Sequence, residues 1–482
     1  MTAVGSLREQ ILRLTAVGAL GTVDRAVSPV HELAAIAHKA DLSGGPALLF
    51  RNVGKHSARV VVGTDSSRER VASALGVELS KLTERYASAL TSPITPTEIS
   101  VGPVHERVFI GDAVDLGELP ILTHFEHDGG PYITSGIVTA VHPVTGERNL
   151  SYHRMQVKGP RELRMVIVPR HLHRIYEAYE DSNQPMPVSI ILGVDAPLRF
   201  AAGTSGSAIP FGADEYGISG GLRCRPEELV RGVTNDLMVP AHAEIVIEGH
   251  VMPHLRGDEG PFAEFAGFYK GTSPRHVVHV DAVTHRTDPI YQGLLSGSME
   301  QLLLMGLPNE PAMLTAMRGG IPEIRAINVT GGGLNKFHVV VALEKKHSGD
   351  GKDAIVAAFA AHRDVKLVVV VDHEVDPFDH VAVERAIATR FRADEDLVVI
   401  SGGRGNPVDT LLTSVGTTAR MGMDATAPLK GQTDLPERAM IPGASEVDLA
   451  EWLSCSTDST SHDEDQTAVD ATTRTAENTK DN

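Results

Sequence analysis

The strongest constraint on the fold is a series of short β-rich runs between Val104 and Pro289, separated by turns of glycine, proline and aspartate. The runs read VHERVFIG, YITSGIVTAV, NLSYHRMQV, RMVIV, PVSIILGV, AEIVIEGHV and RHVVHVDAV. Many short strands with turn signals between them are typical of a barrel or a sandwich. Only HLHRIYEAY, at 171–179, strongly predicts a helix within this series.

Both flanks of the β-rich series alternate between helical and strand patterns. The N-terminal flank combines SLREQILRLTAVGAL, ALLFRNV, RVVVG and a long helical run, and the C-terminal flank combines KDAIVAAFAAH, KLVVVVD and VAVERAIATRF. Such alternation favours an α/β fold, with a mainly parallel sheet in the C-terminal flank. We therefore predict an N-terminal α/β region (1–103), a central barrel-like domain (104–295), a C-terminal α/β domain (296–453) and a disordered acidic tail (454–482).

Charge and composition exclude several classes of protein. The formal net charge of −18 argues against nucleic acid as a partner, because tracking phosphates needs a basic surface. The sequence lacks a run of about 20 apolar residues, so we expect no membrane association. Arg8 and Glu9 interrupt the position of a signal-peptide core, and the two cysteines, Cys224 and Cys455, fit a reducing compartment. We expect a cytoplasmic protein.

Residues 258–269, DEGPFAEFAGFY, place two glutamates in an apolar stretch. Glu259 and Glu264 stand five positions apart, a spacing that puts them on opposite faces of a strand and about 140° apart on a helix. Both can face one place only if the chain bends at Gly260-Pro261. The alternative is a structural turn in which the phenylalanines pack and both glutamates face solvent.

Three further segments carry candidate metal ligands. Asn149 lies in NLSYHRM, a strand pattern with polar residues on both faces. His171 lies in VIVPRHLHR, where a strand leads into a helix. Glu215 lies in the glycine-rich loop FGADEYGISGG. Oxygen and nitrogen ligands of this kind suit Mn²⁺ or Mg²⁺. Spacing alone does not establish this set of ligands. NLSYHRM can be an ordinary edge strand, His171 and His173 a chance H-x-H pair on the surface, and Glu215 a solvated loop residue.

Two glycine-rich turns bear on phosphate binding. HSGDGKDAI, at 347–355, departs from a Walker A motif at Lys346 and Asp353, although a turn, Lys352 and a helix can still bind one phosphate. TGGG, at 330–333, precedes a strand pattern and so does not match a dinucleotide fingerprint. A nicotinamide enzyme is therefore disfavoured.

Taken in order, these pieces resemble the UbiD-type decarboxylases, including the ferulic and cinnamic acid decarboxylases and related aromatic acid decarboxylases, which use prenylated FMN. The resemblance runs from about Thr134 to Leu429. Its motifs are YIT (132–134), N-x-S-x-x-R (149–154), His171 after a proline, DEY (214–216), EGPFAE (259–264), THRTDPIY (284–291), GDGK (349–352) and DATAPL (424–429).

The resemblance implies roles for individual residues. Asn149, His171 and Glu215 would ligate Mn²⁺ or Mg²⁺, with K⁺ as a further candidate ion, and anchor the cofactor phosphate with Lys352. The flavin would also contact Thr134, Ser151, Tyr152, His153, Arg154 and Arg170. Arg154, Glu259 and Glu264 would form the catalytic network. The implied fold contains a split β-barrel like that of flavin reductases. The resemblance also implies homodimers or dimer-based hexamers, and a flavin prenyltransferase that supplies the cofactor.

The implied reaction is reversible, non-oxidative decarboxylation of an α,β-unsaturated or (hetero)aromatic acid. It proceeds through a covalent adduct with prenylated FMN, loss of CO₂ and protonation by Glu264. Two carboxyl groups close together in apolar surroundings cannot both ionise cheaply, so one would remain an acid near neutral pH. Glu259 and Arg154 would position Glu264.

The sequence departs from the ferulic acid decarboxylases in the pocket. Arg170 stands in place of a glutamine, Tyr152-His153 in place of smaller apolar residues, and Met305 at a position that is aliphatic there. Met305 is an adaptable apolar group, so we expect an apolar unsaturated or non-phenolic aromatic acid; the ordinary alternative is a core methionine. Rival functions are a metal-dependent hydrolase without flavin, a non-catalytic FMN-binding protein and, third, a cofactor-making prenyltransferase, whose chains are much shorter.

Overall fold

The computed structural model describes residues 2–204 and 208–429, and beyond them residues 439, 441–443, 446–448 and 452. The chain divides into two compact units, Met1–Lys430 and Gly431–Asn482. All helices and strands below belong to the first unit. The predicted disordered tail at 454–482 lies outside the described residues.

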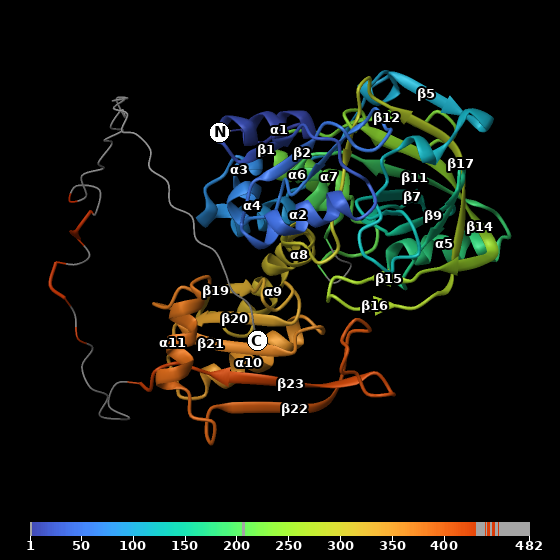
Figure 1. The fold of residues 1–482 in the computed structure, drawn as a ribbon. Helices are drawn as coiled ribbons and strands as arrows, with labels where there is room; N and C mark the ends of the chain where they lie inside the picture. The colour runs from blue at the N-terminus through green and yellow to red at the C-terminus, as the bar shows by residue number, and fades with distance from the viewer. Residues whose placement is uncertain are drawn as a thin grey trace, which may run out of the picture. The chain divides into compact units, whose positions relative to one another are not determined.

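The middle segment of the chain forms a curled antiparallel sheet of nine strands, counted over the described residues, which we call the central sheet and which lies at the right in Figure 1. The strand order is β6 (Tyr132–Ile133), β9 (Met155–Gly159), β10 (Glu162–Met165), β17 (Ser273–His285), β14 (Ile245–Glu259), β11 (Met186–Leu192), β7 (Ile137–Val141) and β8 (Arg148–Tyr152), with β5 (Arg107–Ile110) added on β17. Every β-rich run of the sequence contributes to this sheet, which confirms the predicted β-rich centre. The sheet closes only half of a barrel.

Helix α5 (His171–Asp181) packs on this sheet as its periodicity predicts. Its buried residues Leu172, Ile175 and Tyr176 share one apolar core with strand residues such as Ile190 and Val278. Strands β14 and β17 pair over most of their length, from Ile245 opposite His285 to Glu259 opposite Ser273, with register shifts after Glu248 and after Val251. This long ladder carries Glu259 to the end of the sheet.

Two short helices form where the sequence patterns predict none, α6 (Ala196–Ala202) and α7 (Glu215–Arg223). Asp195 and Asp214 begin them by accepting hydrogen bonds from backbone N–H groups of the first turn. Both helices are buried almost all round. Helix α6 has only seven residues, and α7 contains three glycines, which have low helix propensity, so neither carries a clear helical signal. The predicted glycine-rich loop around Glu215 is wrong, because Glu215 is the first residue of α7.

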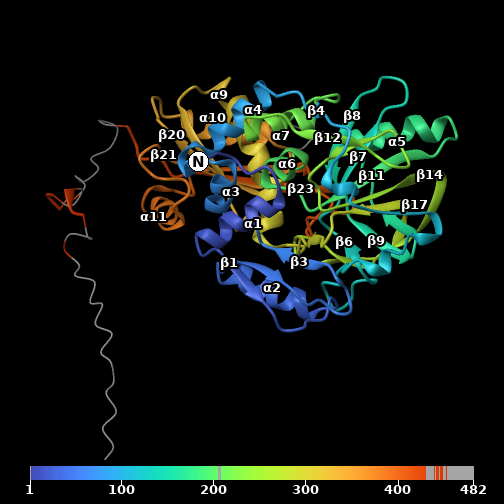
Figure 2. The same ribbon diagram turned by 90° about the horizontal axis from the view of Figure 1, so that it is seen from above.

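The glycines of α7 allow it to approach α4 (Leu82–Thr91) closely. A Cβ atom at Gly221 would lie 2.9 Å from the Cα atom of Ala89. Figure 2 shows α7 beside α4, and α6 beside α3 (Arg68–Leu75). Residues such as Leu75, Tyr86, Phe200 and Leu222 form a common apolar core.

The N-terminal sheet also takes a strand from the central segment. Its order is β1 (Leu20–Val23), β2 (Ala47–Phe50), β3 (Arg59–Val62) and β18 (Ile290–Gln292), with β18 parallel to β3. Helices α1 (Leu7–Ala16) and α2 (Glu32–Leu42) belong to the same region. Strand β18 lies within the predicted central domain (104–295) but pairs with the N-terminal sheet. The predicted domain boundaries at 103 and 295 therefore stay a prediction.

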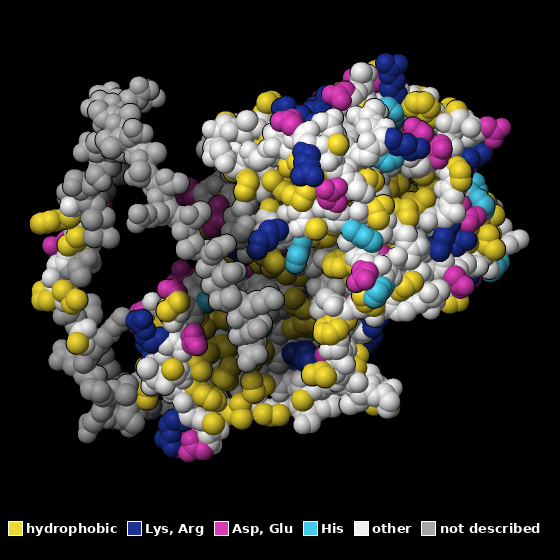
Figure 3. All heavy atoms as spheres, viewed as in Figure 1, with side chains coloured by type: hydrophobic (Ala, Val, Ile, Leu, Met, Phe, Trp, Pro, Cys, Tyr) yellow, Lys and Arg dark blue, Asp and Glu magenta, His cyan; other side chains and the backbone are white. Residues whose placement is uncertain are grey.

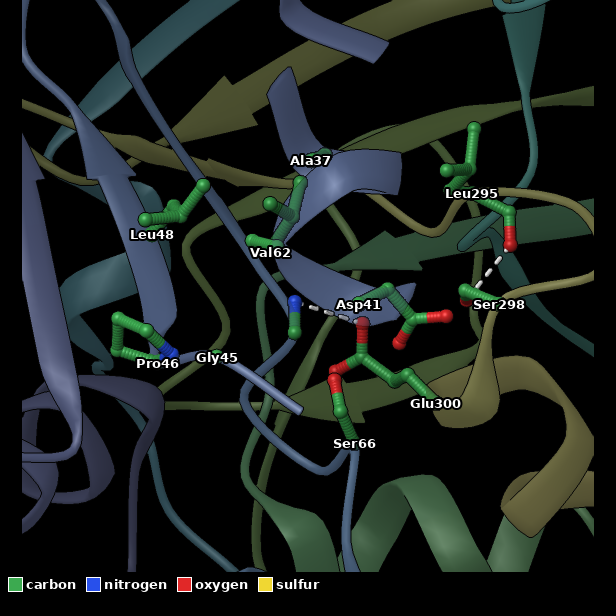
Figure 4. A pocket seen from close by; sticks show the side chains of 12 residues that line it. Ala37, Asp41, Gly45, Pro46, Leu48, Val62, Ser66, Leu295, Ser298 and Glu300 are labelled. Atoms are coloured by element: carbon green, nitrogen blue, oxygen red, sulfur yellow. Dashed lines mark hydrogen bonds between the residues drawn. The ribbon is translucent and has the colours of Figure 1, made fainter. Parts of the chain in front are cut away.

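A fully buried ion cluster joins these parts. Arg199 of α6 donates hydrogen bonds to Asp65, to Thr64 Oγ1 at 2.9 Å and to Glu300 Oε1 at 2.7 Å. Burial, opposed by Arg199 and helped by Glu300, raises the pKa of Asp65 to about 6. A small cavity of about 20 Å³ lies beside Glu300 at the start of α8 (Met299–Gly306), with Asp41 and Ser298 next to it (Figure 4).

The C-terminal sheet is mixed. Its order is β19 (Ile324–Val329), β20 (His338–Leu343), β21 (Leu367–Asp372), β23 (Thr417–Asp424) and β22 (Leu397–Arg404). The inner pairs are parallel and the two outer pairs antiparallel. The predicted mainly parallel sheet is thus correct for the three inner strands only. Its helices are α9 (Glu310–Arg318), α10 (Asp350–Ala361) and α11 (His380–Arg390).

The remaining described strands are short: β4 (Thr97–Glu98), β12 (Glu228–Arg231), β13 (Met238–Pro240), β15 (Phe262–Ala263) and β16 (Tyr269–Lys270). In the described residues, every helix is too short or too polar to cross a membrane. Over the described part of the face in Figure 3, basic and acidic side chains are interspersed.

Buried histidines make the stability of this fold sensitive to acid. The imidazole of His124 is buried, neither ring nitrogen has a hydrogen-bond partner among the described residues, and burial lowers its pKa to about 4. The unfolded chain binds a proton at this residue below about pH 6.5, whereas the folded chain does not. The free energy of unfolding therefore falls as the pH decreases from about 6.5 towards 4.

We expect His124→Phe to reduce this slope by about 1.4 kcal/mol per pH unit between pH 4 and 6.5, because one proton no longer distinguishes the two states. Denaturant unfolding at several pH values measures it. The matched control is His127→Phe, at an exposed histidine whose ring lies beside that of Tyr269, a contact that phenylalanine keeps; it should leave the slope unchanged. A parent-like slope in His124→Phe would contradict the prediction.

Candidate active site

A cavity of about 410 Å³ opens at the end of the central sheet and reaches α8. Its volume is typical of a small-molecule site. Its lining includes every candidate site residue of the sequence analysis except Glu259 and Lys352: Thr134, Asn149, Ser151, Tyr152, His153, Arg154, Arg170, His171, Glu215, Glu264 and Met305. Residues as distant in the chain as Thr134 and Met305 thus meet in one place.

The bend predicted at Gly260-Pro261 is confirmed. Strand β14 ends at Glu259, Gly260 has a φ of +111°, and β15 begins at Phe262. A side chain at Gly260 would be strained by this φ, and its Cβ atom would lie 2.9 Å from the Gly271 carbonyl oxygen. The bend turns Glu259 and Glu264 towards the same guanidinium group, that of Arg154.

Arg154 joins the two carboxylates. Its Nε and Nη2 atoms donate to the two oxygens of Glu259 at 3.0 and 3.1 Å, and its Nη1 atom donates to Glu264 Oε1. The Glu259 side chain is fully buried, while that of Glu264 is 20% exposed and lines the cavity. Two planar groups in bidentate contact hold each other in a fixed orientation. The solvated alternative for this segment is therefore wrong.

Neighbouring groups reinforce this arrangement. The guanidinium carbon of Arg154 lies 4.5 Å from the centre of the Phe262 ring, a cation–π contact. Burial alone would lower the pKa of Arg154, but the charges of Glu264 and Glu259 outweigh it and raise the pKa. Arg154 is therefore a permanent cation, and Glu264 is the carboxyl group that it presents to the cavity.

The three candidate metal ligands line the same cavity from different elements. Asn149 lies in β8, and His171 and Glu215 are the first residues of α5 and α7. Burial raises the pKa of Glu215 to about 8, although its own backbone N–H group and that of Leu150, which donates at 3.2 Å, favour the carboxylate. A buried carboxylate without a cationic partner is costly, so this position suits a bound cation.

The donor set at this position fits a hard or borderline divalent ion. Asn149 and Glu215 can supply oxygen ligands and His171 can supply nitrogen. Across the described residues, no group of three or more histidine, cysteine, aspartate or glutamate residues could hold a metal ion. The candidate set has only two residues of those types, because its third member is an asparagine.

Ser151, His153, Tyr152 and Thr134 are held by hydrogen bonds on the cavity wall. Thr134 Oγ1 donates to the Leu294 carbonyl oxygen at 2.6 Å, and the Tyr152 hydroxyl accepts from Arg199 Nε at 3.4 Å. Ser151 Oγ contacts Asn149 Nδ2 at 2.8 Å and His153 Nε2 at 2.9 Å. The buried Arg199 cluster therefore extends to the cavity through Tyr152.

Lys352 is not brought into the cavity. It is exposed on the first turn of α10 and is not among the lining residues. Arg170, by contrast, lines the cavity next to His171. The predicted role of Lys352 stays a prediction.

Sequence reasoning missed several lining residues. Leu294, Gln301, Leu304 and Val408 line the cavity beside Met305 and Phe262. Ser298 and Gln301 form a capping-box pattern, and the Gln301 amide oxygen accepts from Gly297 N–H at 2.6 Å. This pattern marks the start of α8 but does not mark Gln301 as a lining residue. The others are apolar residues with no signal beyond periodicity.

Comparison with known proteins gives a consistent result. Three family models match in order: the N-terminal domain (residues 11–90), the Rift-related domain (97–299) and the C-terminal domain (302–425) of 3-octaprenyl-4-hydroxybenzoate carboxy-lyase, UbiD. Together they cover most of the chain.

Similar proteins include decarboxylases of different acids. The chain is 38% identical to the anhydromevalonate phosphate decarboxylase of Methanosarcina mazei, over 90% of this chain and 99% of that protein. It is 32% identical to the gallate decarboxylase of Lactiplantibacillus plantarum, over 82% and 81%.

Among solved structures, the UbiD-class enzyme HmfF from Pelotomaculum thermopropionicum in complex with FMN is 40% identical, with a TM-score of 0.89, over 93% of this chain and all of that one. An evolved dimeric form of HmfF in complex with prenylated FMN has a TM-score of 0.85 at 39% identity, over 93% of this chain and 100% of that one. The fold, the family models and the relatives agree. The chain belongs to the UbiD family and is a carboxy-lyase of that class.

Proposed function

We propose that this protein is a prenylated-FMN-dependent, reversible decarboxylase of an apolar α,β-unsaturated or non-phenolic (hetero)aromatic acid. The observation that carries the proposal is the Arg154–Glu259–Glu264 network at a cavity that also contains Asn149, His171 and Glu215. In the alternative hypothesis, a metal-dependent hydrolase without flavin, the Arg154–Glu259–Glu264 network would have no function. The complexes of HmfF with FMN and prenylated FMN support the cofactor.

The cofactor would occupy the cavity between the candidate metal ligands and Arg154. Asn149, His171 and Glu215 would hold Mn²⁺ or Mg²⁺ at its phosphate, and Thr134, Ser151, Tyr152, His153 and Arg170 would contact the flavin. When bound, prenylated FMN supplies the electron sink that cleavage of the C–C bond to CO₂ requires. The proposal also includes K⁺ as a second ion and a flavin prenyltransferase that supplies the cofactor. It further includes a likeness of the curled sheet to the barrel of flavin reductases, and assembly as a homodimer or a dimer-based hexamer.

Glu264 would deliver the proton that replaces CO₂. It is the network carboxyl that faces the cavity, whereas Glu259 is fully buried behind Arg154. Glu259 accepts hydrogen bonds from two guanidinium nitrogens of Arg154 and so fixes the orientation of that group. The third guanidinium nitrogen of Arg154 donates to Glu264 and holds its side chain. Arg154 and Glu259 therefore orient the acid.

Part of the cavity lining is apolar and could face the substrate. Phe262, Leu294, Leu304, Met305 and Val408 form this part, with Gln301 as an uncharged polar group. In the described part of the lining, the arginines are Arg154, which both glutamates engage, and Arg170, beside the candidate metal ligand His171. Since Arg154 is engaged by both glutamates and Arg170 is assigned to the flavin in this proposal, we favour an apolar acid over the one named for the relative from Methanosarcina mazei.

We expect Glu264→Gln to lose decarboxylation by about 10²–10⁴-fold while it still binds FMN, because the amide keeps the shape of the acid but cannot donate its proton. CO₂ release and FMN fluorescence quenching measure the two effects. Asp258→Asn, at an exposed carboxylate six positions earlier, is the matched control. Unchanged turnover in Glu264→Gln would remove Glu264 from its role.

Glu215 allows a test of the metal site. We expect Glu215→Gln to raise the Tm of the metal-free protein at pH 9, because it removes a buried charge, and to abolish the stabilisation that Mn²⁺ gives the parent protein. Thermal unfolding with and without Mn²⁺ measures both effects. An equal rise of Tm with Mn²⁺ in the variant and the parent would exclude Glu215 as a ligand.

Substrate choice is tested with a panel of cinnamic, dienoic, furoic, polycyclic, gallic and anhydromevalonate phosphate acids, using protein co-expressed with a flavin prenyltransferase. We expect the apolar acids to have the highest kcat/KM, and Met305→His to lower it by about 10–200-fold for them, because a polar ring then faces the apolar substrate. Met421→His, at a 39% exposed methionine, is the control. A preference for the phosphorylated acid would overturn the substrate assignment.

A further inference from the structure

Three hydrogen bonds connect Asn149 to a backbone carbonyl group in the cavity wall. Asn149 Nδ2 lies 2.8 Å from Ser151 Oγ, Ser151 Oγ lies 2.9 Å from His153 Nε2, and His153 Nδ1 lies 2.9 Å from the Val166 carbonyl oxygen. Asn149 and His153 are buried. These residues lie at alternate positions, 149, 151 and 153, so their side chains follow one side of the chain as it leaves β8.

The direction of each hydrogen bond follows from its neighbour. A carbonyl oxygen can only accept, so His153 Nδ1 carries the proton that faces Val166. In the neutral ring, Nε2 is then an acceptor and receives the single hydroxyl proton of Ser151. Burial lowers the pKa of His153 to about 4, which is consistent with the neutral ring. The Ser151 oxygen has only lone pairs left for Asn149.

The amide of Asn149 is therefore oriented by this chain of bonds. Its NH₂ group must face Ser151, which turns its oxygen, Oδ1, to the other side. Among the described residues none donates a hydrogen bond to this oxygen, although Asn149 is only 3% exposed and lines the cavity. If the amide were reversed, Ser151 would have to donate to it, and His153 Nε2 would lose its donor.

We propose that His153 is a positioning residue that, through Ser151, presents the Asn149 carbonyl oxygen to a divalent cation shared with His171 and Glu215. This inference rests on the metal site in the proposed function. A hard cation accepts an amide only through its oxygen, because the NH₂ group directs hydrogens at the ion. His153 thus acts on the cation without touching it, as groups behind metal ligands commonly do.

The test measures Mn²⁺ binding to the purified full chain with FMN present, by the loss of the free-ion EPR signal. We expect His153→Phe, which keeps an aromatic ring but accepts no hydrogen bond, to weaken binding by about 10–100-fold. Ser151→Ala should weaken it similarly. The double variant should bind no more weakly than either single variant, since one chain of bonds can be broken only once.

A rescue variant separates orientation from general damage. In Asn149→Asp both side-chain oxygens can bind the ion, so orientation no longer matters. Adding His153→Phe to this variant should change Mn²⁺ affinity by less than about 3-fold. If His153→Phe caused an equal loss of affinity with and without Asn149→Asp, the proposal would be overturned. Parent-like affinity in His153→Phe, or a parent protein that binds no Mn²⁺, would overturn it too.

The result is independent of turnover. If Mn²⁺ binding responds as expected but the parent protein loaded with prenylated FMN releases CO₂ from none of the acids, the proposed function fails while the positioning role stands. If CO₂ is released but His153→Phe binds Mn²⁺ like the parent, the positioning role fails alone.

Discussion

The ion pairs of Arg154 with Glu259 and Glu264 are the interaction on which the candidate site depends. Its guanidinium group is satisfied on one edge by the fully buried Glu259 and on the other side by Glu264, and its face lies against Phe262. Burial of such charges is tolerable only because they are paired and hydrogen-bonded with good geometry. The same pairing fixes one carboxyl group at the cavity surface, where an acid can act.

The surrounding fold makes this pairing possible. Glu259 stands at the end of the long β14–β17 ladder, and the bend at Gly260 returns the chain so that Glu264 meets Arg154 from the other direction. Arg154 follows β8, the strand that also carries Asn149. A single strand and a single bend thus place both the acid network and the first candidate metal ligand.

The other wall of the cavity depends on tight helix packing. Glycines in α7 let it lie against α4, and its first residue, Glu215, is thereby held at the cavity. The Arg199 cluster ties α6 to the start of α8, the helix that carries Met305. The parts of the cavity wall that α7 and α8 contribute are therefore connected through buried charges and small residues.

Prediction from the sequence succeeded where the signal is local. The β-rich runs, helix α5 and the bend between the two glutamates are all present, because alternation, periodicity and a Gly-Pro pair act over a few residues. It failed at α6 and α7, because α6 spans only seven residues and α7 contains three glycines, which have low helix propensity. It also failed to anticipate that Gln301 and Val408 line the cavity, since nothing local marks an inward-facing residue.

The sequence by itself determined the family, the order of α/β and β-rich segments and the identity of the chemical groups, because residue types and their short-range spacing carry that information. The tertiary structure alone decided which groups meet. It joined Arg154 to both glutamates, brought Glu215 to Asn149 and His171, set β18 into the N-terminal sheet and left Lys352 outside the cavity lining. The physical reason is that these contacts join residues far apart in the chain, and only the packing of the whole core determines which of them form.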